Sequence, residues 1–138
     1  MNKRIVYLLD QIEIYLRELE RYMPKTFKAY DLNLEKKRFC ERTLQLMIEI
    51  CIDVSQLLVK DLKLGVPSEE ENIFDKLEEA KIISSSLSKK LKDMKKFRNV
   101  LIHKYTDIVD KLVYEHATKQ QTDFLQFKKE IISFLKKH

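Results

Sequence analysis

A stretch of eight residues, Arg98–Tyr105, collects side chains that can do chemistry more densely than any other part of the chain. It reads Arg-Asn-Val-Leu-Ile-His-Lys-Tyr and combines a permanent cation, an amide, a group that titrates near neutral pH and a phenol. Cleavage of RNA by its own 2′-hydroxyl needs a base that removes a proton and a cation that holds the phosphate. Histidine and arginine suit those tasks. The pair Arg98 and His103 therefore predicts a metal-independent ribonuclease.

Helical geometry sets a condition on this pair. Residues five apart on a straight helix point about 140° away from each other, so Arg98 must reach around or the helix must distort. Asn99 and His103 are four apart and share a face, so the amide can orient the imidazole or contact the substrate. Thr106 indicates that the helix is already ending at Tyr105. The phenol is then either exposed beside the histidine or packed on the core as a helix-end aromatic.

Each of these groups also has an ordinary explanation when taken alone. A single histidine near a helix end is usually a surface or capping residue, and a single arginine is usually a solvated charge. The lysines before Arg98 fit the solvated face of an amphipathic helix, although together they could steer RNA in a salt-dependent way. They are Lys89, Lys90, Lys92, Lys95 and Lys96. Asp53 is either partly exposed without a role, or a buried acid paired with Arg98 or His103.

Composition predicts the scaffold that must position these groups. The chain has 138 residues, of which 44% are hydrophobic and 36% charged, with one glycine and two prolines. Glycine and proline are the residues that tight turns between strands require, and their scarcity argues against a sheet. We therefore expect a single all-α domain over residues 1–138. No apolar run approaches the roughly 18 residues of a membrane span, which predicts a cytoplasmic protein. The net charge of +5 leans mildly toward polyanionic partners.

Apolar residues at helical spacing predict a bundle of about five helices. The first is expected from Asn2 to Met23, and residues 24–32 form a connection with a helical turn of its own. The second helix is expected at 33–63 and is ended by Gly65 and Pro67, and the third begins at a capping box at 68–71. The fourth helix is expected from a serine cap at 84–86 to His103. The fifth is expected from Thr106 and Asp107 to His138, with a bend in 118–123.

The sequence lacks the motifs of the common nucleotide-binding loops and metal sites. A single glycine excludes the phosphate-binding loop and the dinucleotide fingerprint, which both need several glycines. Neither CxxC nor HExxH occurs, and His116 has no second histidine at ligand spacing, so we expect no metal and no cofactor. Cys40 and Cys51 lie about 16 Å apart on one predicted helix and cannot bond to each other, so they are expected to be reduced core thiols.

The octapeptide, in the form R-N-x-L-x-H-x-Y, resembles the signature of the HEPN superfamily, specifically the HepT-like toxins. Residues 41–54 also resemble the second helix of that branch, and the order of helices matches over essentially the whole chain. The resemblance implies an all-α HEPN bundle that forms a homodimer, with the two copies of the motif facing a shared cleft.

The same resemblance implies roles for the residues of the motif. Arg98 and His103 would be the catalytic pair of an endoribonuclease that cuts RNA by 2′-hydroxyl attack, and Asn99 an accessory polar residue. The family's partner is a minimal nucleotidyltransferase antitoxin, which neutralises the toxin by transferring AMP from ATP to the motif tyrosine, here Tyr105. An adenylated phenol would add bulk and negative charge where the RNA phosphate must sit.

Two other functions remain open on the sequence. HEPN domains also occur as noncatalytic modules, in which the motif binds a nucleotide or holds a partner protein. Alternatively, the octapeptide is only a helix end at a dimer interface, and Arg98→Ala would then affect dimerisation more than RNA cleavage.

Overall fold

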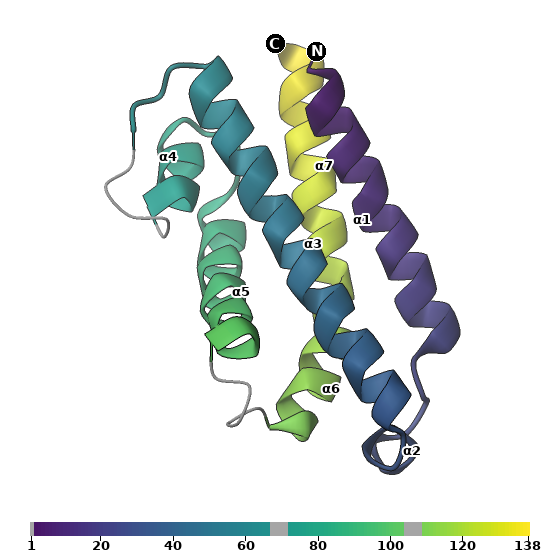
Figure 1. Ribbon diagram of the computed structural model, residues 1–138. Coiled ribbons are helices and arrows are strands. Elements are labelled where there is room, and N and C mark those ends of the chain that lie inside the picture. Colours follow the sequence, from purple (N-terminus) through teal and green to yellow (C-terminus); the bar gives the residue numbers. More distant parts are fainter. Residues whose placement is uncertain (1, 67–71, 104–108) are drawn as a thin grey trace.

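The chain folds into a bundle of helices, which confirms the predicted all-α class. The computed structural model describes residues 2–66, 72–103 and 109–138, and these residues form seven helices and no strand (Figure 1). The helices are α1 (Lys3–Tyr22), α2 (Phe27–Asp31), α3 (Leu34–Asp61), α4 (Asn72–Glu79), α5 (Ser85–His103), α6 (Asp110–Lys119) and α7 (Gln121–Lys137).

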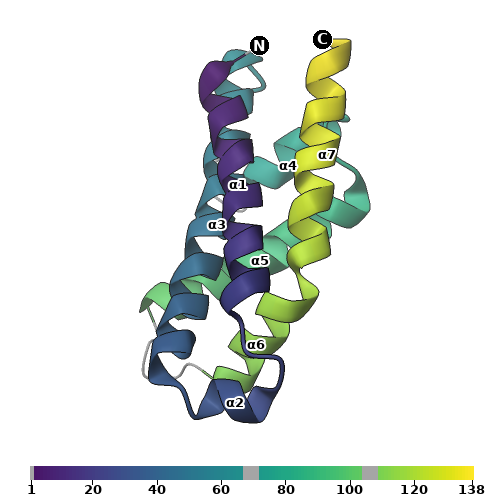
Figure 2. The ribbon, with the colours of Figure 1, turned by 90° about the vertical axis from the view of Figure 1, so that its right-hand side faces the viewer.

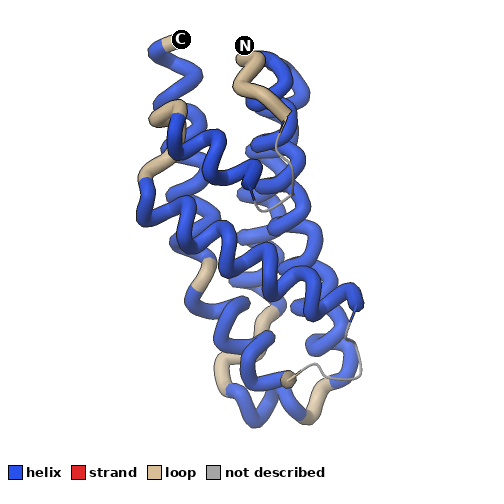
Figure 3. Tube along the Cα trace, turned by 90° about the vertical axis from the view of Figure 1, so that its left-hand side faces the viewer, coloured by secondary structure: helices blue, strands red, loops and turns tan. Residues whose placement is uncertain are grey.

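The longest helix, α3, forms the middle of the bundle. Helix α1 packs on one flank of α3, α7 packs on α1 and α5, and both ends of the chain lie at the same end of the bundle (Figures 1 and 2). Helices α4 and α5 pack on the other flank of α3, and α2 and α6 close the far end. Short loops connect the helices within the described residues (Figure 3). This arrangement places α5, which carries the motif, directly against α3.

The apolar stripes predicted from the sequence form the core. On α1 the buried residues recur at helical spacing, and they are Ile5, Leu8, Leu9, Ile12, Leu16 and Leu19. Burying each such side chain contributes roughly 1.5–3 kcal/mol to folding. Helix α3 is buried on two sides, because α1 packs on one and α5 on the other. Cys40 and Cys51 are free and buried, as predicted, and burial raises the pKa of the Cys40 thiol to about 11.

The helix ends show one cap that was predicted and one that was not. The Asn2 side chain accepts hydrogen bonds from the backbone N–H groups of Arg4 and Ile5, at 2.8 and 3.2 Å, and caps α1 as expected. Helix α3 ends at Asp61, two residues earlier than predicted. Lys63 adopts the left-handed conformation that ends the helix, with φ of 54°, and Gly65, two residues later, also has a positive φ, of 99°. The N–H of Leu64 then donates to the carbonyl of Val59 at 3.0 Å.

The number of helices exceeds the predicted five for two reasons. The connection at 24–32 contains α2, which matches the expected helical turn. The last helix is divided at Gln120 into α6 and α7, within the segment where a bend was predicted. The predicted capping box at 68–71, Pro67, Thr106 and Asp107 lie outside the described residues.

Candidate functional site

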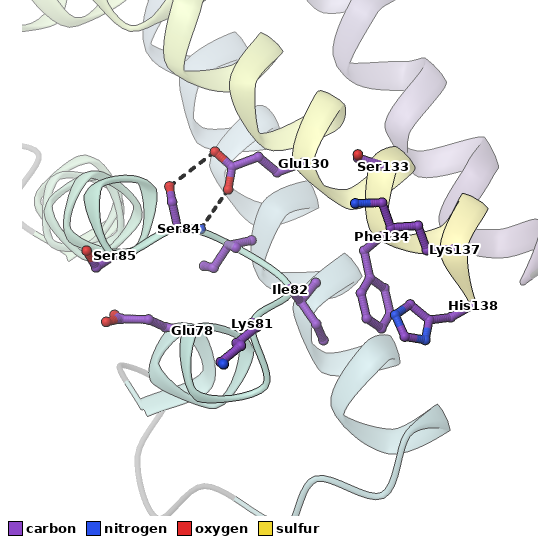
Figure 4. A pocket seen from close by; sticks show the side chains of 11 residues that line it. Glu78, Lys81, Ile82, Ser84, Ser85, Glu130, Ser133, Phe134, Lys137 and His138 are labelled. Atoms are coloured by element: carbon purple, nitrogen blue, oxygen red, sulfur yellow. Dashed lines mark hydrogen bonds between the residues drawn. The ribbon is translucent and has the colours of Figure 1, made fainter.

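The first turn of α5 is anchored to α7 through Ser84. The Ser84 hydroxyl accepts a hydrogen bond from the N–H of Leu87 at 3.2 Å, so Ser84 caps the helix, as the serine run predicted. The Ser84 N–H donates to Glu130 Oε1 at 2.7 Å and its hydroxyl donates to Oε2 at 3.2 Å (Figure 4). Because these bonds use both carboxylate oxygens, the start of α5 is fixed relative to α7.

The C-terminal half of α5 packs against α6 through an aromatic contact. The rings of Phe97 and His116 lie 4.1 Å apart, centroid to centroid, at an interplanar angle of 33°. The side-chain amide of Gln120 contacts Nδ1 of His116, and burial lowers the pKa of the imidazole. A neutral His116 ring therefore packs against the residue that directly precedes Arg98.

Arg98 opens onto a cavity of about 270 Å³ between α3 and α5. The other residues that line it all come from α3, and they are Glu49, Ile52, Asp53 and Gln56. The Arg98 side chain is only 14% exposed, and its Nη1 lies 4.0 Å from Oε1 of Glu49. The same Glu49 oxygen accepts a hydrogen bond from Nε2 of Gln45 at 3.1 Å. The guanidinium is thus placed in a polar groove that a phosphate oxygen could enter.

Asp53 is an exposed residue of this cavity, so the alternative of a buried acid is wrong. Within the described part of the chain it forms no ion pair with Arg98 or His103. Burial first and then the Glu49 carboxylate raise the pKa of Asp53, while Arg4 and Arg98 oppose the shift. Asp53 faces the mouth of the Arg98 groove because it lies one helical turn beyond Glu49.

His103 is the last residue of α5, where it is exposed to solvent. It is not among the described residues that line the Arg98 cavity. Asn99 is half-buried, and no hydrogen bond joins it to His103. Tyr105 lies outside the described residues. The sequence did not single out Glu49 and Gln56 as cavity residues, although both lie on the face of α3 that carries Asp53.

The lysines that precede Arg98 divide into several environments. Lys92 forms an ion pair with Asp75 of α4, and Lys90 forms one with Asp123 of α7 at 3.4 Å. Lys95 is buried, whereas Lys89 and Lys96 are exposed. A continuous basic track toward Arg98 is therefore not formed by these five side chains, and only part of the set is available to attract RNA.

A second hollow, of about 570 Å³, lies at the opposite end of α5 from His103 (Figure 4). Residues of α4, of the first turn of α5 and of α7 line it, and Glu130 is already engaged with Ser84. A helix of this length spans about 28 Å, which separates the hollow from the end of the motif. The described residues contain no group of three or more metal-ligating side chains. None of the described helices is both long and apolar enough to cross a membrane.

Comparisons with known proteins agree with this architecture. A solved structure of a tri-AMPylated HEPN toxin from Shewanella oneidensis, in complex with an MNT antitoxin, superposes with a TM-score of 0.88. That match covers 96% of this chain and 99% of the other at 24% identity, and it shows the fold. A tRNA nuclease HepT from Aphanizomenon flos-aquae (strain 2012/KM1/D3) is 26% identical over 127 residues, which cover 92% of this chain and 86% of that protein.

An mRNA nuclease HepT from Shewanella oneidensis is 31% identical over 84 residues, or 61% of this chain and 63% of that protein. The model of the family described as ribonuclease HepT-like matches residues 12–131. This match runs from α1 into α7 and includes both sides of the Arg98 cavity. The chain therefore belongs to the ribonuclease HepT-like family.

Proposed function

We propose that the protein is a metal-independent endoribonuclease toxin in which Arg98 and His103 act on one RNA phosphodiester. The observation that carries the proposal is the guanidinium of Arg98, held in an open polar groove on the same helix that ends at His103. Membership of a family described as ribonuclease HepT-like supports the assignment. So do the two relatives, which are a tRNA nuclease and an mRNA nuclease.

The chemistry follows from the two side chains. His103 takes the proton of a 2′-hydroxyl, and the oxygen attacks the adjacent phosphorus. The bond from phosphorus to the 5′ oxygen breaks, and that oxygen takes up a proton from water. The products are a 2′,3′-cyclic phosphate and a 5′-hydroxyl. Arg98 stabilises the negative charge that grows on the non-bridging oxygens, which is the contribution that a metal ion makes in other nucleases.

A homodimer is part of this proposal. Arg98 lines the α3–α5 cavity, and His103, exposed at the end of α5, is not among the described residues that line it. A second copy that places its motif against the first would supply the missing group across a shared cleft. Asn99, half-buried beside Arg98, would contact the substrate, and Asp53 would act as an accessory polar residue at the mouth of the groove.

The proposed partner is a minimal nucleotidyltransferase antitoxin that transfers AMP from ATP to the Tyr105 hydroxyl and releases pyrophosphate. The tri-AMPylated toxin of Shewanella oneidensis, in complex with an MNT antitoxin, supports this partner. The modification would block the site because it adds a negative charge two residues beyond His103. Incubation with an active antitoxin and ATP should add the mass of AMP to the wild type and not to Tyr105→Phe. An unchanged wild-type mass would contradict the role.

Cleavage is tested with purified protein, labelled RNA and a chelator. The wild type should cut RNA, and His103→Ala and Arg98→Ala should each lower the rate by about 100-fold or more. His138→Ala removes another exposed histidine, far from the motif, and should cut at the wild-type rate. The proposal is wrong if the wild type cuts no faster than His103→Ala.

A noncatalytic binding module is the second candidate. The two carboxylates that line the Arg98 cavity, Glu49 and Asp53, favour it. This candidate predicts RNA or nucleotide binding without cleavage, and growth that expression of the protein does not slow. Measurable cleavage that disappears in His103→Ala would exclude it.

A further inference from the structure

One face of α3 carries polar side chains at successive helical turns, and two of them, Glu49 and Asp53, line the Arg98 cavity. Gln45, Glu49 and Asp53 are four residues apart and therefore point the same way. Oε1 of Glu49 is the common point of the contacts, because it accepts the amide hydrogen bond from Gln45 at 3.1 Å and lies 4.0 Å from Nη1 of Arg98. The carboxylate is thus oriented from one side and faces the guanidinium on the other.

The orientation of the Arg98 side chain depends on the side chains that surround it. An arginine side chain has several rotatable bonds, and ordering them has an entropic cost. Only 14% of the Arg98 side chain and 34% of the Glu49 side chain are exposed, so solvent screens their attraction less than it would at the surface. The distance of 4.0 Å exceeds a hydrogen bond, so the contact is electrostatic.

We propose that Glu49 is a positioning residue that directs the guanidinium of Arg98 into the α3–α5 groove, and that Gln45 holds Glu49 in place for this task. The inference rests on the proposed function, because it concerns the group that would hold the RNA phosphate. Glu49 does not itself bind the substrate, since a carboxylate repels a phosphate. Its contribution is the orientation of Arg98 before the RNA arrives.

This role has a kinetic signature that separates it from simple repulsion of RNA. Loss of the Glu49 charge removes a negative group from the groove, so it does not weaken RNA binding, and KM stays the same or falls. A misdirected guanidinium stabilises the transition state less, and displacements of this kind lower kcat by about 10- to 100-fold. Glu49→Gln should therefore lower kcat without raising KM, while thermal unfolding shows that the variant is folded.

Glu41→Gln is the matched control. Glu41 also lies on α3 and also forms an ion pair with an arginine, Arg38, at 2.8 Å. The control variant therefore changes the net charge by the same amount, on the same helix, away from the Arg98 cavity. It should keep the kcat and KM of the wild type. A Glu49→Gln protein with wild-type kcat, or one in which only KM changes, would overturn the inference.

A measurement without RNA separates failure of this inference from failure of the proposed function. The NMR signals of a guanidinium held in one orientation are distinct from those of a freely rotating one, and Arg98→Lys assigns the signal. We expect the Arg98 signal of the free protein to show restricted rotation in the wild type and in Glu41→Gln, and faster rotation in Glu49→Gln. If Glu49→Gln leaves the signal unchanged, the inference is wrong whether or not the wild type cleaves RNA.

Discussion

Two inactive variants should regain RNA cleavage when they share one dimer. Arg98 lines the α3–α5 cavity and His103 is not among the described residues that line it, so the proposed site is expected to take Arg98 from one chain and His103 from the other. In a dimer of one Arg98→Ala and one His103→Ala subunit, one site loses both groups and the other keeps both. Neither variant homodimer keeps an intact site.

The expected magnitude follows from the symmetry of the proposed dimer. A twofold dimer has two equivalent sites, so the purified heterodimer should cut RNA at about half the wild-type rate. Since each parent variant is expected to lose about 100-fold, the heterodimer should exceed either parent by about 50-fold. Co-expression of the two variants with different affinity tags, followed by purification on both tags, isolates the heterodimer. Its cleavage of labelled RNA is then measured in the presence of a chelator.

The matched control is a heterodimer of His103→Ala with the double variant Arg98→Ala/His103→Ala. It passes through the same purification, yet no arrangement of its two chains contains an intact pair, so it should remain as inactive as the parents. If the heterodimer of one Arg98→Ala chain and one His103→Ala chain is also no more active than its parents, the site does not combine residues of the two chains. The reasoning that places Arg98 and His103 of one site on different chains is then refuted.

Three further predictions concern stability. Lys81→Gly should stabilise the fold by about 1 kcal/mol, or about 4 °C in Tm, because Lys81 has a left-handed φ of 59°; an equal or lower Tm would contradict this. Ser84→Ala should destabilise by about 1 kcal/mol in urea unfolding through loss of the α5 cap, whereas the exposed Ser86→Ala should have an effect below about 0.5 kcal/mol. Burial lowers the pKa of His116 below its ordinary 6.5. The neutral, half-buried imidazole therefore contributes fully to the stability of the fold above pH 6.5, and this contribution is lost as the pH falls through the pKa of His116 in the folded protein. The Tm difference between pH 7.5 and pH 5 should therefore shrink in His116→Phe, and an unchanged difference would contradict the assignment.

Local signals account for the parts of the fold that the sequence predicted. The apolar spacing of α1, the Asn2 cap and the serine cap of α5 all depend on residues within one or two helical turns. The ends of α3 and α4 were harder to predict, because Lys63 and Lys81 take left-handed conformations that lysine rarely adopts. Gly65 was a stronger sequence signal than Lys63, yet it lies two residues beyond the turn that ends α3.

The site was predictable in its motif and not in its surroundings. The resemblance and the family match both include Arg98 and His103, and helical spacing already indicated that the two point apart. Glu49 could not be selected, because its contact with Arg98 arises only when α3 packs against α5. The exposure of Asp53 depends in the same way on where α5 crosses α3, since the sequence of α3 alone does not show how far the buried face extends.

The central claim is that the 2′-hydroxyl of RNA is the nucleophile and that no metal ion takes part. It is tested most directly by mapping a cut site in the presence of a chelator and then placing a single 2′-deoxynucleotide on the 5′ side of that bond. The account predicts that the all-RNA substrate is cut there to a 2′,3′-cyclic phosphate and that the substituted substrate is not cut at that bond. Cleavage of the substituted bond, or cleavage that begins only when a divalent cation is added, would contradict the account.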